Sequence, residues 1–271
     1  REATLQRGAQ QMMFAKEGAE WKISRPKTVK ADAAKITDLL SKVSSQRVTS
    51  YVDENPAELK TYGLDAPALI FSVFLGENRA QKTLAIGRQS GDQFFARDLS
   101  RRSIFKVDTA FVHRLQVSLA DVRSKKVLSF NASEVNRLTV RQNDSTFVFV
   151  KDTSNTWTMT APQPLAIKGW KISSLVSELE LMNAVSFVDD APSALRPFGL
   201  DAPQVLCELY QDDRLIDQLL IGRRDGKDGL FVNSGGHSAV YTVSKDLLDK
   251  IRINLPQLLE PAAPDAAGTV K

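Results

Sequence analysis

The stretch that decides the fold is Tyr-Gly-Leu-Asp-Ala-Pro at residues 62–67, which returns as Phe-Gly-Leu-Asp-Ala-Pro at residues 198–203. The second copy of the phrase lies 136 positions after the first. An internal repeat indicates that one structural unit occurs twice, and missing it would assign the wrong fold. Six residues are too few to establish a repeat, so the flanking sequence has to carry the argument.

The flanking residues stay in register with the phrase over more than 100 positions. At the same offset lie Trp21 and Trp157, Pro26 and Pro162, Asp53 and Asp189, and Phe95 and Phe231. Only residues 85–88 (AIGR) and 220–223 (LIGR) deviate, by one position, which a deletion and an insertion in turns explain. We therefore expect a first repeat at residues 1–130, a second at 131–260, and a disordered Pro/Ala-rich tail at 261–271.

Each repeat reads as several strands, one main helix and then mostly adjacent strands. Apolar residues at helical spacing predict the main helices at 31–45 and 169–182. Alternating apolar residues and turn residues predict the surrounding strands, for example at 138–142, 146–151 and 156–160. Adjacent strands with short loops favour antiparallel pairing, so the predicted fold class is α+β, with two tandem pseudo-symmetric repeats.

The residues of the repeated phrase have stereochemical roles. Gly63 and Gly199 should end a short helix with a positive φ angle, and Leu64 and Leu200 should enter the core. Asp65 and Asp201 should bond their own backbone, and Pro67 and Pro203 should begin the next strand. We also expect Asp65 to pair with Arg88, and Asp201 with Arg223. The alternative, that Asp65 and Asp201 are paired active-site carboxylates, is disfavoured because duplicated packing is commoner than duplicated chemistry.

The first strand of the first repeat looks incomplete. Subtracting 136 from the strand at 138–142 gives residues 2–6, which lack its alternation of Leu and Val. We expect the first repeat to begin inside or just after its opening strand, and the chain to be part of a longer protein.

The residues that usually carry catalysis or bind metals are scarce. The single cysteine, Cys207, aligns with Phe71 in a strand and should be a buried thiol. The two histidines, His113 and His237, do not correspond under the repeat and have no local partner. The Gly-rich stretches 223–229 and 233–238 fall between strands and read as hairpin loops. Trp21 and Trp157 could stack on sugars, but their repeated position before a proline favours packing. We therefore expect no enzyme, no metal and no cofactor.

Composition narrows the possible partners. The formal net charge is +4, from 36 Lys and Arg against 32 Asp and Glu, without a long basic run, so no nucleic-acid partner is expected. No stretch of about 18 apolar residues is present that would span a bilayer.

Several motifs together resemble a known family. They are GLDAP, LAIG or LLIG, FFAR or LFVN, IFKV or VYTV, and ADVRSKKVLSF at 120–130. In this order they resemble the bacterial domain of unknown function 4340 family. The resemblance implies an extracytoplasmic domain behind one N-terminal membrane helix, often encoded beside ABC-transporter components of the gliding-motility type. It supplies no catalytic residues, and this chain lacks the membrane helix.

The sequence thus predicts a non-enzymatic interaction or scaffold domain of a membrane-anchored bacterial protein. Its expected location is periplasmic or cell-surface, and its expected partner is a membrane protein such as an ABC-transporter component. The alternative is a module that binds a small ligand or glycan between the two repeats. An enzyme of unrecognised type is the third possibility.

Overall fold

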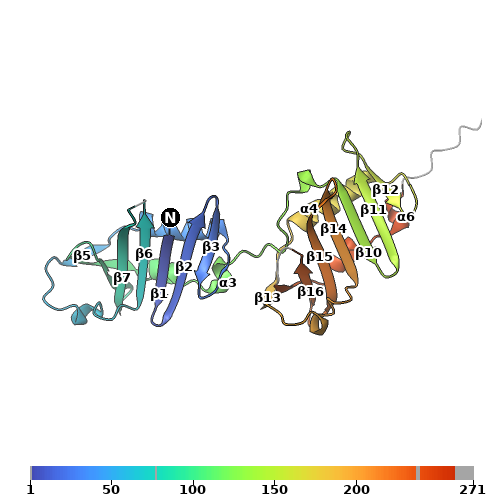
Figure 1. Cartoon of the computed structure of the whole chain (residues 1–271). Helices are drawn as coiled ribbons and strands as arrows, with labels where there is room; N and C mark the ends of the chain where they lie inside the picture. Colours follow the sequence, from blue (N-terminus) through green and yellow to red (C-terminus); the bar gives the residue numbers. More distant parts are fainter. Residues whose placement is uncertain (1, 77, 236–238, 260–271) are drawn as a thin grey trace, which may run out of the picture. The chain divides into compact units, whose positions relative to one another are not determined.

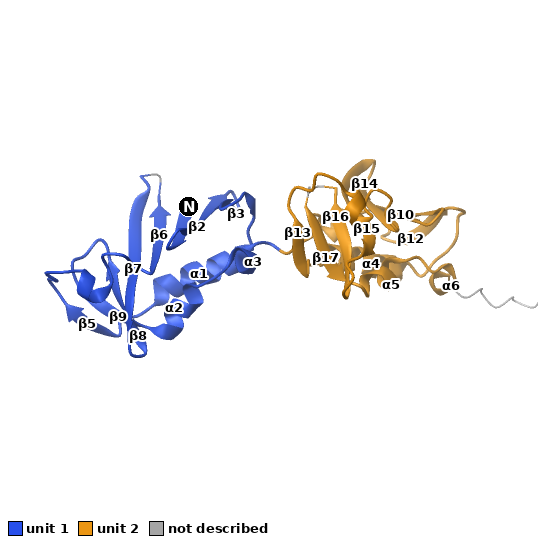
Figure 2. Cartoon of the chain, turned by 90° about the horizontal axis from the view of Figure 1, so that it is seen from below, with its two compact units in different colours: residues 1–124 blue, residues 125–271 orange. Residues whose placement is uncertain are grey.

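The computed structural model describes residues 2–76, 78–235 and 239–259. The chain forms two compact units, unit 1 at Arg1–Ser124 and unit 2 at Lys125–Lys271 (Figures 1 and 2). The division lies ahead of the boundary expected at residue 130 because Val127 and Leu128 belong to the core of unit 2. The tail expected to be disordered, 261–271, lies outside the described residues.

Unit 1 contains a nine-stranded antiparallel sheet with the strand order β4-β3-β2-β1-β6-β7-β8-β9-β5. Its strands are β1 (Glu2–Arg7), β2 (Gln10–Glu17), β3 (Glu20–Arg25), β4 (Val29–Lys30), β5 (Ser50–Asp53), β6 (Leu69–Leu75), β7 (Ala80–Ser90), β8 (Gln93–Asp98) and β9 (Ile104–Asp108).

Three α-helices and one 3-10 turn complete unit 1. They are α1 (Ala33–Ser45), α2 (Thr109–Leu115), α3 (Leu119–Val122) and the 3-10 turn η1 (Lys60–Tyr62). The Asp32 side chain caps α1 by accepting from the backbone N–H groups of Ala34 and Lys35. Helix α1 buries Ile36 and Leu39 and contacts α2 and α3 beside the sheet (Figure 2).

Unit 2 contains an eight-stranded antiparallel sheet with the order β12-β11-β10-β14-β15-β16-β17-β13. Its strands are β10 (Arg137–Gln142), β11 (Ser145–Lys151), β12 (Trp157–Ala161), β13 (Ser186–Asp189), β14 (Val205–Gln211), β15 (Arg214–Arg224), β16 (Gly229–Ser234) and β17 (Val240–Ser244). Its helical segments are η2 (Ala132–Glu134), α4 (Gly169–Glu180), η3 (Arg196–Phe198), α5 (Leu247–Ile251) and α6 (Leu255–Leu258). Two antiparallel sheets accompanied by few helices place the chain in the α+β class.

The pairing registers correct the interpretation of the first strand. Leu5 pairs with Phe71 in unit 1, and Val140 pairs with Cys207 in unit 2, so the offset at this strand is 135 rather than 136. The difference lies in the β11–β12 connection: the chain between the paired residues Lys151 and Trp157 is one residue longer than that between the equivalent pair Lys16 and Trp21 in unit 1. A shift of one residue exchanges the two faces of a strand, which is why the alternation looked absent. Strands β1 and β10 each have six residues; β1 buries Ala3 and Leu5, and β10 buries Leu138 and Val140 together with Thr139 between them.

The short helices expected before Gly63 and Gly199 are also corrected. The structure has only the three-residue 3-10 turns η1 and η3 there. A segment this short makes too few hydrogen bonds to offset the cost of helix nucleation, so a single tight turn forms instead.

Candidate functional site

The repeated phrase forms the same turn in both units. The φ angles of Gly63 and Gly199 are 65° and 67°, which confirms the predicted left-handed conformation. Leu64 and Leu200 are buried directly after it, as expected. Only glycine adopts this conformation without a steric penalty at its Cβ.

A second glycine explains why the phrase recurs together with AIGR and LIGR. A Cβ atom on Gly87 would overlap the carbonyl oxygen of Tyr62, and one on Gly222 would overlap that of Phe198. The turn therefore crosses β7 in unit 1 and β15 in unit 2 so closely that the backbones of turn and strand are in contact. A side chain on the strand residue at the crossing has no space. The signal was present in the sequence, since both glycines fall at equivalent repeat positions.

The predicted ion pairs of the phrase are wrong. In the described residues, no salt bridge joins Asp65 to Arg88 or Asp201 to Arg223, and both aspartates are exposed. The two guanidinium groups instead lie over aromatic rings, Arg88 over Phe95 at 5.8 Å and Arg223 over Phe231 at 5.7 Å from the ring centroid. A planar guanidinium is favourably placed over a ring face, and this contact keeps each arginine on the sheet.

The aspartates also lack the predicted turn bonds, since the described structure gives neither Asp65 nor Asp201 a hydrogen bond to its own backbone. Pro67 and Pro203 lie two residues before β6 and β14, where they prevent helix and favour extended backbone. The phrase therefore acts through its two glycines, its leucine and its proline, while its aspartate stays in solvent.

Trp21, Trp157 and Cys207 are core residues. Both tryptophans are buried in the cores of their units and present no free ring face to a sugar. Cys207 is fully buried, and burial, followed by the charge of Glu208, raises the pKa of its thiol to about 12. A thiol of this kind stays protonated and is a poor nucleophile.

The other sequence-based candidates are not assembled into a centre. His113 is exposed on α2, whereas His237 lies outside the described residues. Among the residues with a described position, no group of three or more His, Cys, Asp or Glu side chains could hold a metal ion. No helix in the described part of the chain is both long and apolar enough to cross a membrane. The expected ligand or glycan site between the repeats remains a prediction.

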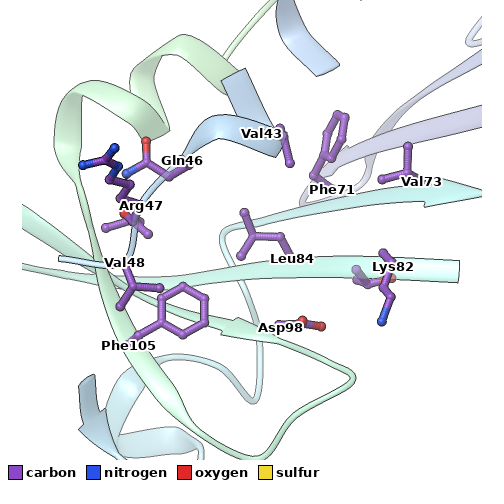
Figure 3. Close-up of a pocket in the computed structure, with 12 residues that line it drawn as sticks. Val43, Gln46, Arg47, Val48, Phe71, Val73, Lys82, Leu84, Asp98 and Phe105 are labelled. Atoms are coloured by element: carbon purple, nitrogen blue, oxygen red, sulfur yellow. Dashed lines mark hydrogen bonds between the residues drawn. The ribbon is translucent and has the colours of Figure 1, made fainter. Parts of the chain in front are cut away.

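A groove in unit 1 is the candidate site (Figure 3). It has a volume of about 200 Å³ and lies between the C-terminal end of α1 and the strands β6, β7 and β9. We call it the unit 1 groove; it is lined by Val43, Gln46, Arg47, Val48, Phe71, Val73, Lys82, Thr83, Leu84, Asp98, Phe105 and Val107. Figure 3 shows Arg47 on one side of its apolar residues and Lys82 on the other.

The equivalent region of unit 2 can be identified from the pairing registers. The N–H of Thr49 donates to the carbonyl of Lys106, and the N–H of Val185 donates to the carbonyl of Thr242. Lys106 and Thr242 are equivalent strand residues, so the residues before these donors are equivalent too. Val48 therefore corresponds to Ala184, and Gln46 to Met182. On strand β7, Lys82 pairs with Val73, as Asp217 pairs with Leu209 on β15. Lys82 therefore corresponds to Asp217.

In unit 2 this region is occupied by the chain itself. The N–H of Ala184 donates to the carbonyl of Lys125 at 2.7 Å, and the N–H of Val127 donates to the carbonyl of Met182 at 3.3 Å. Further along, the N–H of Ser129 donates to Asp217 Oδ2 at 2.8 Å. Residues 125–129 thus run from the end of α4 to strand β15. We call residues 125–130 the covering segment.

The covering segment changes the burial of the residues around it. Val127 and Leu128 are fully buried in the unit 2 core. Around them Leu179, Leu209 and Leu219 are fully buried, whereas the equivalent residues of unit 1, Val43, Val73 and Leu84, are only partly buried. Val48 is 37% exposed, compared with 5% for Ala184. The unit 1 groove is therefore an apolar surface that unit 2 covers with its own chain.

The charges around the two regions are opposite. Unit 1 presents Arg47, Lys82 and Asp98, at the positions that Asn183, Asp217 and Ser234 occupy in unit 2. Burial works to raise the pKa of Asp98, but hydrogen bonds from Ser100 and the charge of Lys82 hold it below its usual value. Asp98 is therefore ionised at neutral pH, and the unit 1 groove keeps two cations against one anion.

Two further cavities lie among the described residues. One of about 720 Å³ lies beside the β1–β2 hairpin and includes Arg7 and Arg25. The other, of about 210 Å³, lies beside the exposed Trp170 in unit 2. Ser118 lines the larger cavity, and its hydroxyl donates to Asp121 Oδ2 at 2.6 Å within the capping box of α3.

Comparison with known proteins gives one match. A family model described as "Domain of unknown function (DUF4340)" matches residues 21–203 and, a second time, residues 157–262. The second match begins at Trp157, the equivalent of Trp21 at the start of the first, which supports the internal repeat. No curated protein and no solved structure matches the chain.

Proposed function

Because this chain belongs to the DUF4340 family, whose function is unknown, we propose a function from its own geometry: it is a non-enzymatic interaction domain whose unit 1 groove receives a partner. The observation that carries the proposal is the apolar lining of the unit 1 groove, where Val48 is 37% exposed. Arg47 and Lys82 lie on opposite sides of these apolar residues (Figure 3). Accessible apolar surface rimmed by charge is typical of protein interaction sites.

The proposed setting is a bacterial membrane surface. We place the protein outside the cytoplasm, anchored to the inner membrane, with a membrane protein of an ABC-transporter system as its partner. The support is the order of the family motifs. An Ala57→Cys variant tests the location, because Ala57 is exposed and Cys207 is buried and unreactive. Labelling of intact spheroplasts by a membrane-impermeant thiol reagent is expected; labelling only after lysis would contradict this location.

We also propose that the two units are pseudo-symmetric copies. Their sheets have the same strand order apart from the additional β4, which supports the proposal. In an experimental structure, residues 10–117 should superpose on 146–253 with equivalent strands aligned. A different strand path in one unit would contradict it.

The interaction function is tested by changing the groove in the native cell. The native gene is replaced by the wild type, by Val48→Asp, or by the matched control Leu75→Asp, since Leu75 is also an exposed apolar residue of unit 1 but lies outside the groove. After cross-linking, membrane proteins that co-purify with the wild type and the control should be lost from Val48→Asp. Equal recovery from all three proteins would contradict the proposal.

A further inference from the structure

We propose that the larger of the two further cavities, beside the β1–β2 hairpin of unit 1, binds a small amphiphilic anion. Arg7 and Arg25 would hold its oxyanion head group, and the apolar residues between them would hold a short aliphatic chain. We call it the arginine cavity; it is lined by Leu5, Arg7, Ala9, Gln10, Gln11, Met12, Arg25, Pro26, Ser118 and Leu119. It shares no lining residue with the unit 1 groove, so this inference does not depend on the proposed interaction function.

The arginine cavity has the size of a ligand site. Its volume of about 720 Å³ lies within the ~300–1,000 Å³ typical of small-molecule sites, whereas the other two cavities have about 200 and 210 Å³. It lies where Arg7 precedes the hairpin turn, at the opposite end of β1 from Glu2. In unit 2 the covering segment bonds to Asp217, which the pairing registers place near the start of β10 and not at its hairpin end. A segment in that position would therefore leave the arginine cavity open.

Two arginines without an acidic partner supply the charge. Arg7 Nη2 donates to the carbonyl oxygen of Val117 at 3.3 Å, and Arg25 Nη1 donates to Gln11 Oε1 at 3.3 Å. Within the described part of the chain, neither guanidinium forms an ion pair. Each guanidinium carries five N–H donors, so both keep donors for a ligand. Arginine donors of this kind match the oxygens of a phosphate or carboxylate.

The described residues that line the arginine cavity include no acidic side chain to oppose these cations. The carboxylate of Asp121 is held outside the lining, where it accepts from both the N–H and the hydroxyl of Ser118. These bonds form the capping box of α3, so this carboxylate already has a structural role.

Unit 2 shows that the fold needs neither cation. The pairing registers place Gln142 at the position of Arg7, and Ala161 at that of Arg25. Gln142 bonds both the N–H and the carbonyl of Ile253, at 2.8 and 2.9 Å, and so ties its strand to the chain before α6. Arg7 replaces these two bonds with one longer bond. Because neutral side chains form the same hairpin in unit 2, the two arginines of unit 1 need another explanation, which an anionic ligand provides.

The rest of the arginine cavity suits an aliphatic chain. Leu5 and Met12 pair across β1 and β2 and are nearly buried, whereas Pro26 is exposed and Leu119 is half-buried. An inorganic phosphate would leave this apolar surface in water. A ligand that joins a head group to a chain would cover the surface and neutralise the arginines together.

The test is a titration of the full chain followed by amide NMR, with hexyl phosphate as the probe. Saturable binding is expected below about 1 mM, with shifts confined to unit 1 and centred on residues 5–12, 25 and 118–119. Hexanol lacks the charge and inorganic phosphate lacks the chain, so each should bind at least about tenfold more weakly. Hexyltrimethylammonium, which reverses the charge, should not bind.

Variants copied from unit 2 separate recognition from misfolding. Arg7→Gln and Arg25→Ala introduce side chains that the equivalent hairpin of unit 2 already accommodates, so both proteins should keep the wild-type amide spectrum elsewhere. Each should weaken hexyl phosphate binding by about tenfold. The matched control Arg102→Gln removes an exposed arginine of unit 1 outside the arginine cavity, and it should bind as the wild type does.

The same head group occurs in soluble organic phosphates and in anionic lipids, and sedimentation with vesicles distinguishes them. Binding to phosphatidylcholine vesicles only when they contain phosphatidic acid, and its loss in Arg7→Gln, would support the site with a lipid as the source. Hexyl phosphate binding without vesicle binding would support it with a soluble ligand. The proposal is overturned by no saturable binding at about 1 mM hexyl phosphate, by equal binding of hexanol, or by unchanged affinity in both arginine variants.

Discussion

The two units share a strand order but differ in what covers the end of the main helix and the adjoining strands. In unit 2, residues 125–130 lie there and bury Val127 and Leu128. In unit 1, the equivalent surface is the open groove around Val48. The comparison shows that sheet and main helix alone leave this apolar surface exposed, so a separate segment has to complete it. Unit 2 takes that segment from its own chain, directly before its first strand β10.

The repeated turn shows which contacts both units need. Tyr62 packs edge-on against Phe95 at 5.1 Å between ring centroids, and Phe198 packs on Phe231 in the same way at 5.2 Å. Only Tyr62 adds a hydrogen bond, to Asp53 Oδ2 at 3.0 Å, because Phe198 has no hydroxyl. Aromatic packing and the glycine crossing are therefore common to the units, and the polar contact is an addition in unit 1.

The largest expected effect comes from the glycine crossing. Gly87→Ala and Gly222→Ala would each force a methyl group into a backbone carbonyl oxygen, that of Tyr62 or Phe198. Because backbone cannot move aside as a flexible side chain can, each variant should lose about 4 kcal/mol or more of its unit's stability. Chemical denaturation followed by circular dichroism measures the loss, and hydrogen exchange identifies the unit that opens.

A control variant separates the stability loss caused by steric overlap from the loss caused by backbone strain. Gly91 has a φ angle of 65° but no heavy atom within 4 Å of the added Cβ position. Gly91→Ala should therefore cost only about 1–2 kcal/mol. If Gly87→Ala costs no more than this control, the crossing is not a close backbone contact and the explanation for the repeated phrase fails.

The covering segment gives the next largest effect. Leu128→Ala removes a fully buried side chain and should destabilise unit 2 by about 3 kcal/mol through lost burial and the remaining cavity. Leu99→Ala, at an exposed leucine, should change stability by less than about 0.5 kcal/mol. Cys207 provides the measurement, because it lies in the unit 2 core and reacts with a thiol reagent only after that core opens. Its labelling should accelerate about 100-fold in Leu128→Ala.

An unchanged labelling rate in Leu128→Ala would break the comparison between the units. It would mean that the covering segment lies on unit 2 without stabilising it. The equivalent surface of unit 1 would then need no covering segment for its stability.

The sequence predicted what depends on local stereochemistry. The φ angles of Gly63 and Gly199, the burial of Trp21 and Trp157 and the main helices follow from residue type and periodicity, and these predictions are confirmed. The predicted Asp–Arg ion pairs are wrong because opposite charges in the sequence do not reveal that an aromatic ring lies beside each arginine. The first strand was misjudged because one extra residue in a distant turn changed the offset.

The groove was beyond sequence reasoning because it depends on contacts between segments far apart in the chain. Nothing local to Val48 or Lys82 shows that they lie on one surface. The covering segment also reads as a linker until its hydrogen bonds to Met182, Ala184 and Asp217 are known. One signal was available: Val127 and Leu128 are adjacent aliphatic residues in a stretch expected to connect the repeats.

The smallest expected effect is a pH dependence of unit 2 alone. Burial, with the charge of Glu208, raises the pKa of the Cys207 thiol to about 12, while the equivalent residue of unit 1, Phe71, does not titrate. A pKa raised by folding stabilises the protein fully below the unfolded-state pKa, and that contribution is lost as pH rises toward the folded-state value. The window therefore runs from about pH 9, the ordinary value for a thiol, to about 12.

Within it unit 2 should lose about 1 kcal/mol between pH 9 and 10, measured by urea denaturation with hydrogen exchange to resolve the units. Cys207→Ala removes this term, and the lysines and tyrosines that titrate in the same range are common to both proteins and cancel in the difference. Parallel pH profiles for the wild type and Cys207→Ala, or an equal difference in unit 1, would show that the thiol is not held in a closed core.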